Sequence, residues 1–148
     1  VIADIAPVSY ALTHMHVIDS MRAVDLKEVA LRSDADRALS KTVDDPTVRA
    51  FLLQSLNVRD KMWQLNLDAL AANMDDVLAW PDMGDAVFEG PVLFLTGGLS
   101  DYVQPEARPG IRKHFPKARF AKIPNVGHWL HAENPRDFEA SVRIFLDS

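Results

Sequence analysis

Two residues in the C-terminal third of the chain, Asp101 and His128, are the types that a nucleophilic hydrolase uses as acid and base. Each follows a short apolar run, 92–96 before the aspartate and 119–123 before the histidine. A carboxylate that holds a histidine in one tautomer leaves the other ring nitrogen free to take a proton from a nucleophile. These residues therefore predict two of the three members of a catalytic triad.

Both apolar runs are typical of buried parallel strands, because they are short and are bounded by glycine and proline. The segment between them, 105–115, is long enough for one crossover helix. A strand–helix–strand crossover is right-handed, and such sheets bind ligands beyond the carboxyl ends of their strands. We therefore predict an α/β fold in which Asp101 and His128 share one rim of a parallel sheet.

The motifs around these residues resemble the C-terminal part of an α/β-hydrolase. Gly98-Leu-Ser-Asp101-Tyr-Val103 resembles the acid loop after the seventh strand of that superfamily. Gly127-His128-Trp-Leu-His131-Ala-Glu133-Asn-Pro135 resembles the histidine loop after the eighth strand. The opening Val1-Ile-Ala-Asp4-Ile-Ala-Pro7 resembles the end of the sixth strand in the esterase branch. The resemblance covers the whole chain and implies about three parallel strands with flanking helices, plus an inserted helical cap.

The resemblance implies that His128 is the general base and that an aspartate is the triad acid. Two aspartates stand at positions that members of the superfamily use for this acid. Asp101 is favoured because its loop is the more common one, and Asp4 is the alternative at the end of the sixth strand. Taken alone, Asp101 would fit equally well as a turn or N-cap residue. His131 is expected to have a structural role beside the last helix.

The chain divides into three segments by composition and motif. Residues 1–9 are expected to begin the hydrolase core, residues 10–80 to form the helical cap, and residues 81–148 to complete the core. The middle segment contains no glycine and has helix starts such as Asp45-Pro46, with an extended link expected over 58–65. A final helix is expected to begin after Asn134.

Large apolar residues of the middle segment and its end are candidates for lining an acyl pocket under such a cap. They are Met62, Trp63, Met74 and Trp80. A Met or Trp at helical spacing is more often an ordinary core residue, and this alternative is the stronger one for each residue taken singly.

A serine hydrolase also needs a nucleophile on a G-x-S-x-G elbow and backbone N–H donors for the oxyanion. None of the serines in the sequence has that setting, and Ser100 stands beside Asp101 instead. We therefore expect the C-terminal portion of a serine carboxylic-ester hydrolase that supplies the triad base and acid, with the nucleophile absent from this chain. The alternative is a non-catalytic truncated module that folds and self-associates, because an exposed strand edge invites pairing.

Composition limits the partners and the location. The net charge is −5 without a basic block, so nucleic acid is not an expected partner. The chain has no cysteine, no apolar run of membrane-spanning length and no signal-peptide pattern. We expect a cytoplasmic protein with no membrane contact and no metal or organic cofactor. The expected partners are a small-molecule ester and, at the sheet edge, the missing N-terminal half or another copy.

Overall fold

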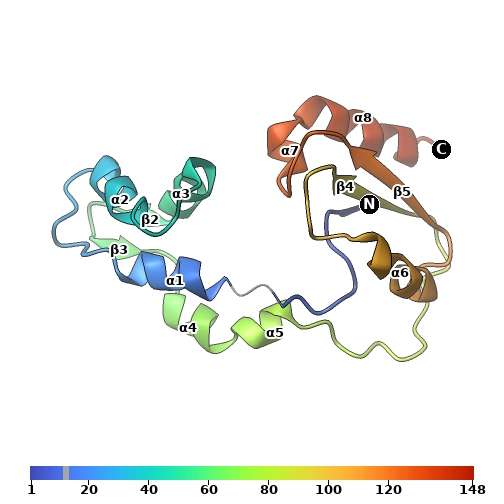
Figure 1. Cartoon of the computed structure of the whole chain (residues 1–148), viewed down its shortest axis with the longest axis horizontal. Helices are drawn as coiled ribbons and strands as arrows, with labels where there is room; N and C mark the ends of the chain where they lie inside the picture. The colour runs from blue at the N-terminus through green and yellow to red at the C-terminus, as the bar shows by residue number, and fades with distance from the viewer. Residues whose placement is uncertain (12–13) are drawn as a thin grey trace. The chain divides into compact units, whose positions relative to one another are not determined.

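The computed structural model describes residues 1–11 and 14–148, and the chain divides into two compact units (Figure 1). One unit combines residues 1–9 with residues 80–148, and the other lies within residues 10–79. Each unit has buried apolar clusters of its own. The first unit contains the sheet, and the second is mainly helical.

The sheet consists of three parallel strands in the order β1-β4-β5. These strands are β1 (Ile2–Ala3), β4 (Val92–Gly97) and β5 (Ala118–Ile123). Phe94 of the central strand lies opposite both Ile2 and Phe120. The two strands predicted from the apolar runs are thus confirmed as parallel neighbours, and the α/β class with them.

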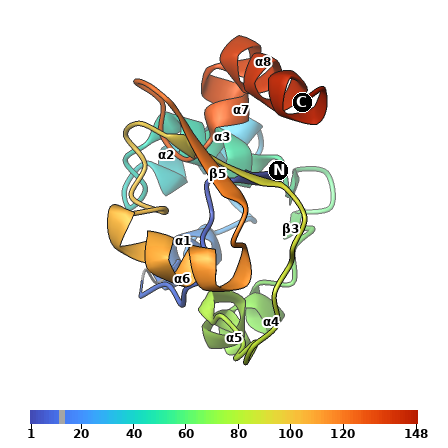
Figure 2. The same ribbon diagram turned by 90° about the vertical axis from the view of Figure 1, so that its right-hand side faces the viewer.

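Helices cover both faces of this sheet, as Figures 1 and 2 show. The 3₁₀-helix η1 (Pro105–Ala107) and helix α6 (Arg108–His114) form the crossover between β4 and β5. Helices α7 (Leu130–Glu133) and α8 (Pro135–Leu146) lie on the opposite face. Because both faces are covered, every residue of β4 is buried.

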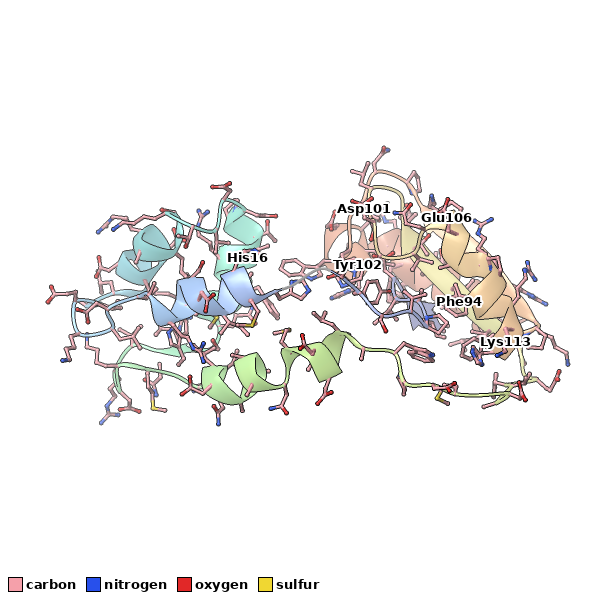
Figure 3. All side chains as sticks on the ribbon, turned by 60° about the horizontal axis from the view of Figure 1, so that its bottom comes forward. His16, Phe94, Asp101, Tyr102, Glu106 and Lys113 are labelled. Atoms are coloured by element: carbon pink, nitrogen blue, oxygen red, sulfur yellow. The ribbon has the colours of Figure 1, made fainter. Side chains whose placement is uncertain are left out.

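Side chains of β4 alternate between two apolar clusters, as the pleat of a strand requires. Phe94, labelled in Figure 3, packs with Ile111 of α6, whereas its neighbours Leu93 and Leu95 pack on the other face. There they meet Phe138 and further residues of α8. The sheet is therefore packed between two apolar layers, and this packing fixes the positions of the loops that follow the carboxyl ends of its strands.

Helix α8 begins as the sequence predicts. The side chain of Asn134 accepts a hydrogen bond from the backbone N–H of Asp137 at 3.2 Å, and Pro135 occupies the first turn. Leu130 of the preceding short helix is 1% exposed. The loop that carries His128 is thus fixed on its C-terminal side by a buried leucine and a capped helix.

The other unit contains five helices and one hairpin within its described residues. The helices are α1 (Met15–Arg22), α2 (Arg32–Leu39), α3 (Pro46–Leu53), α4 (Leu67–Ala72) and α5 (Met74–Leu78). The side chain of Asp45 accepts a hydrogen bond from the backbone N–H of Thr47 at 2.7 Å, so it caps α3. Strands β2 (Leu56–Asn57) and β3 (Met62–Trp63) pair antiparallel, so the expected link over 58–65 is partly an ordered hairpin.

The four candidate pocket residues have different surroundings. Met74 is buried in the core of the helical unit, and Trp63 packs against that core with its Nε1–H donating to the Met21 carbonyl at 3.0 Å. Met62 is 50% exposed and Trp80 is 39% exposed. Met74 and Trp63 therefore have core roles.

None of the helices in the described residues combines the length and apolar character needed to span a bilayer.

Candidate active site

His128 and Asp4 form the central pair of the site. Nδ1 of His128 lies 2.9 Å from Oδ2 of Asp4, although the two residues are 124 positions apart in the chain. A carboxylate can only accept, so the imidazole donates its Nδ1–H, and in the neutral ring this contact makes Nε2 the acceptor. Within the described residues Nε2 has no hydrogen-bond partner, and the His128 side chain is 40% exposed. The free nitrogen is thus available to a reacting group.

Asp4 is built into the end of β1 as a buried acceptor. It is 1% exposed, and its φ of 48° lies in the left-handed region, which Asp adopts more readily than most residues. The carboxylate accepts the backbone N–H of Gly97 at 3.1 Å on Oδ1 and the hydroxyl of Ser100 on Oδ2. With His128 it therefore has three donors, and these hydrogen bonds offset the cost of burying a carboxylate.

The loop after β4 holds this pair from the side. Ser100 donates to Asp4 and accepts the backbone N–H of Tyr102 at 3.2 Å. The ring of Tyr102 is stacked on the imidazole of His128, with ring centroids 3.8 Å apart and planes inclined by 17°. Ser100 and Tyr102 were missed as site residues from the sequence. They stand on either side of Asp101 in the sequence. Their spacing would have indicated that both lie on the same side of the loop, but the sequence does not show which side faces His128.

Asp101 lies in the same loop but does not join the pair. Its carboxylate is exposed and accepts a hydrogen bond from Nε2 of Gln104 at 3.2 Å. Figure 3 labels Asp101 beside Tyr102 in the loop that follows β4. The structure thus brings His128 together with Asp4, the alternative acid, and leaves Asp101, the favoured one, as an exposed turn residue.

The histidine loop is pinned by its own residues. The Glu133 carboxylate accepts the backbone N–H of Gly127 at 2.7 Å. His131, the second histidine of the motif, is exposed and its ring lies 6.0 Å from that of Phe138 in an edge-on arrangement. His131 therefore contacts the last helix and not the Asp4 carboxylate.

Gly97 allows the two loops to approach closely. A Cβ at this position would lie 2.1 Å from the Gly127 carbonyl oxygen and 2.7 Å from that of Val126. Both obstacles are backbone atoms, which cannot move aside as a flexible side chain can. The end of β4 must therefore be glycine if the histidine loop is to keep its place beside Asp4.

We expect Gly97→Ala to destabilise the chain by about 1–3 kcal/mol, because overpacking forces a backbone shift. The matched control is Gly110→Ala in α6, where nothing lies within 4 Å of the added Cβ. That change should be neutral or stabilising by up to about 1 kcal/mol, since alanine is the better helix former. Urea unfolding midpoints of the two variants measure the difference. Equal midpoints would show that the loops can separate without loss.

A small hollow elsewhere on the unit takes no part in the pair. It has a volume of about 80 Å³ and lies between the β4–α6 connection and β5, with Arg108 and Phe120 among its lining residues. Neither His128 nor Asp4 lines it. No cluster of three or more potential metal ligands occurs in the part of the chain that the structure describes.

Known proteins similar to this chain include esterases and lipases. No model of a protein family matches it. The chain is 39% identical over 155 residues to the sn-1-specific diacylglycerol lipase ABHD11 of Mus musculus, covering 99% of this chain and 50% of the lipase. It is 30% identical over 145 residues to Esterase YbfF of Escherichia coli (strain K12), covering 97% of this chain and 56% of the esterase.

A solved structure described as a marine microorganism esterase superposes with a TM-score of 0.89 at 33% identity. That match covers 97% of this chain and 58% of the esterase. The chain thus spans about half the length of the curated relatives it matches. With its parallel sheet and flanking helices, this chain belongs to the α/β-hydrolase superfamily and corresponds to the C-terminal part of that fold.

Proposed function

We propose that this chain supplies the general base and its orienting acid to a carboxylic-ester hydrolase. The observation that carries the proposal is the hydrogen bond of 2.9 Å between Nδ1 of His128 and the buried Asp4 carboxylate, with Nε2 left free. The names of two relatives, an esterase and a diacylglycerol lipase, support a carboxylic ester as the bond that is cleaved. A serine outside residues 1–148 is the proposed nucleophile.

The proposed reaction follows from which nitrogen is free. Nε2 of His128 accepts the serine proton while the serine oxygen attacks the ester carbonyl carbon. The resulting imidazolium then gives this proton to the departing alkoxide, which leaves an acyl-serine and a free alcohol. Water attacks the acyl-serine with the same base, releasing the carboxylic acid and regenerating the serine. Asp4 stays ionised and stabilises the imidazolium in both halves.

Ser100 is a poor candidate for the attacking hydroxyl, even though it is close to the pair. Its hydroxyl proton is directed to Asp4, and its oxygen already accepts the N–H of Tyr102. A nucleophile must instead direct its proton to Nε2 of the base. Ser100 also has no G-x-S-x-G elbow around it. These contacts support a role for Ser100 in holding the acid.

We propose that residues 10–80 form a cap in the complete enzyme. Support comes from the helical character of the unit within residues 10–79 and from its insertion between β1 and β4. The core would then combine residues 1–9 with residues 81–148.

Reconstitution tests the proposal. We expect co-expression of this chain with the N-terminal portion of a related esterase, carrying a G-x-S-x-G elbow, to hydrolyse p-nitrophenyl acetate. A fluorophosphonate probe should label the elbow serine in the complex, because only there is the serine next to a base. Each part alone is the control. A folded complex that neither hydrolyses the ester nor takes up the probe would contradict the proposal.

A second candidate function is a non-catalytic module that self-associates. Within the described residues β1 pairs only with β4, and its flanking residues Val1 and Ile5 are 48% and 49% exposed. An open apolar strand edge favours pairing with another chain. Sedimentation of the chain alone should then show dimers or larger species. A monomer at all concentrations that gains esterase activity with the N-terminal portion would favour the enzyme instead.

A further inference from the structure

We propose that Tyr102 is a positioning residue for His128, holding the plane of the imidazole so that Nδ1 faces Asp4 and Nε2 faces the substrate side. The catalytic consequence rests on the proposed function, whereas the positioning itself rests on geometry alone. The proposal follows from the stack of the two rings, whose centroids are 3.8 Å apart with planes inclined by 17°.

A single hydrogen bond does not fix the plane of a ring. The bond from Nδ1 to Asp4 holds one atom of the imidazole, and the ring can still rock about that bond. The side chain is 40% exposed, so general packing does not immobilise it. A near-parallel aromatic ring supplies the second restraint, because tilting the imidazole would separate the two faces or press them together.

The same loop sets the positions of the phenol ring and of the acid. The backbone N–H of Tyr102 donates to Ser100, and the hydroxyl of Ser100 donates to Asp4. Two further backbone bonds join this loop to the end of β5 and to the segment just before Gly127, from Gly98 N–H to the Ile123 carbonyl and from Leu99 N–H to the Val126 carbonyl, each 2.8 Å long. The same loop therefore sets both the direction of the hydrogen bond from His128 to Asp4 and the plane of the His128 imidazole.

Stacking also suits the charged form of the base. The face of an aromatic ring carries negative potential and attracts a cation lying over it. The imidazolium that forms when His128 takes the serine proton would lie against this face. Because the effect comes from the ring, it predicts that Phe can replace Tyr102 and that an aliphatic side chain of similar size cannot.

The geometric test uses the 148-residue chain by itself and needs no nucleophile. The tyrosine ring current should shift the carbon-bound imidazole protons of His128 upfield in ¹H–¹³C NMR spectra. Tyr102→Leu should move these signals downfield, to where an unstacked histidine is found, and Tyr102→Phe should leave them nearly unchanged. The signals of His131, whose ring lies near Phe138, are the internal control and should not move.

A third variant covers the case in which Tyr102→Leu does not fold. Tyr102→Trp keeps a stacking partner with a larger ring current, so the His128 signals should move further upfield. If the chemical shifts of the His128 imidazole protons are the same in all folded variants at position 102, the proposal is overturned. The proposed function does not affect this result, since no reaction is measured.

The kinetic test uses the complex reconstituted with an elbow-bearing N-terminal portion. Tyr102→Leu should lower kcat for p-nitrophenyl acetate by about 3- to 10-fold with KM little changed, from the strength of an aromatic pair. Tyr102→Phe should restore the rate. A change confined to KM would indicate a role of Tyr102 in substrate binding. An equal loss of kcat in both variants would indicate a role of the tyrosine hydroxyl. Either result would overturn the positioning role. If the complex with Tyr102 in place shows no esterase activity at all, this result would instead count against the proposed function.

Discussion

In the complex reconstituted with an elbow-bearing N-terminal portion, replacing His128 by alanine is expected to lower kcat for p-nitrophenyl acetate by at least about 10³-fold. His128 carries the nitrogen of the pair that does not contact Asp4, and without it the serine of the proposed triad would keep its proton and attack poorly. Binding of the ester does not depend on proton transfer, so KM should change much less than kcat. Steady-state rates at saturating ester measure the effect.

The matched control is His131→Ala, three positions further along the chain in helix α7. Its ring contacts Phe138 and is exposed, so the rate should stay within about threefold of the unsubstituted complex. Added imidazole gives a second check, because removal of the His128 ring takes away one of the three donors to Asp4 and leaves space beside it. A small imidazole bound there should restore part of the rate. Full activity of His128→Ala without added imidazole would exclude this residue as the base.

Local patterns predicted the elements that position His128. The apolar run before the histidine and the Asn134-Pro135 helix start are short-range signals, since each depends on neighbours within a few residues. The structure has a strand over Ala118–Ile123 and a helix over Pro135–Leu146, with the loop between them. The parallel neighbour β4 follows from the crossover rule, which is equally local in its requirements.

The choice between the two aspartates could not be made in this way. The partner of His128 depends on strand order, and β1 pairs with β4 across almost ninety residues of sequence, including the whole helical unit. It also depends on which side of the β4 loop turns inward, and the bond from Ser100 to Asp4 settles this. Neither property is visible in a window of neighbouring residues, and the more common loop position favoured Asp101.

The hairpin in the helical unit was missed for a related reason. Its strands have only two residues each, Leu56–Asn57 and Met62–Trp63, too few for an alternating pattern to emerge. The turn is closed by hydrogen bonds between Asn57 and Asp60, and by Lys61, which has a φ of 55°. A lysine gives no turn signal comparable to glycine at such a position. The extended character of the segment was predictable, but its pairing was not.

Exchanging each candidate acid for its amide separates their roles. Asp4→Asn is expected to lower kcat of the reconstituted complex by about 10²- to 10⁴-fold, and Asp101→Asn to change it by less than about threefold. Asp4 receives three donors, from Gly97, Ser100 and His128. An amide has one acceptor oxygen, and its NH₂ would face a donor, so His128 loses the partner that fixes its tautomer.

Asp101→Asn is the matched control, because an asparagine oxygen can still accept the Gln104 amide in the exposed turn. Both variants change one carboxylate to an amide of nearly the same shape. The difference between their kcat values therefore reports where the carboxylate lies and not the loss of one negative charge. Asp4→Asn should also lower the urea midpoint, since a buried donor left facing an amide NH₂ costs about 1–3 kcal/mol. A large loss for Asp101→Asn with an active Asp4→Asn would assign the acid to the exposed turn, and the loop would then have to close differently around the complete site.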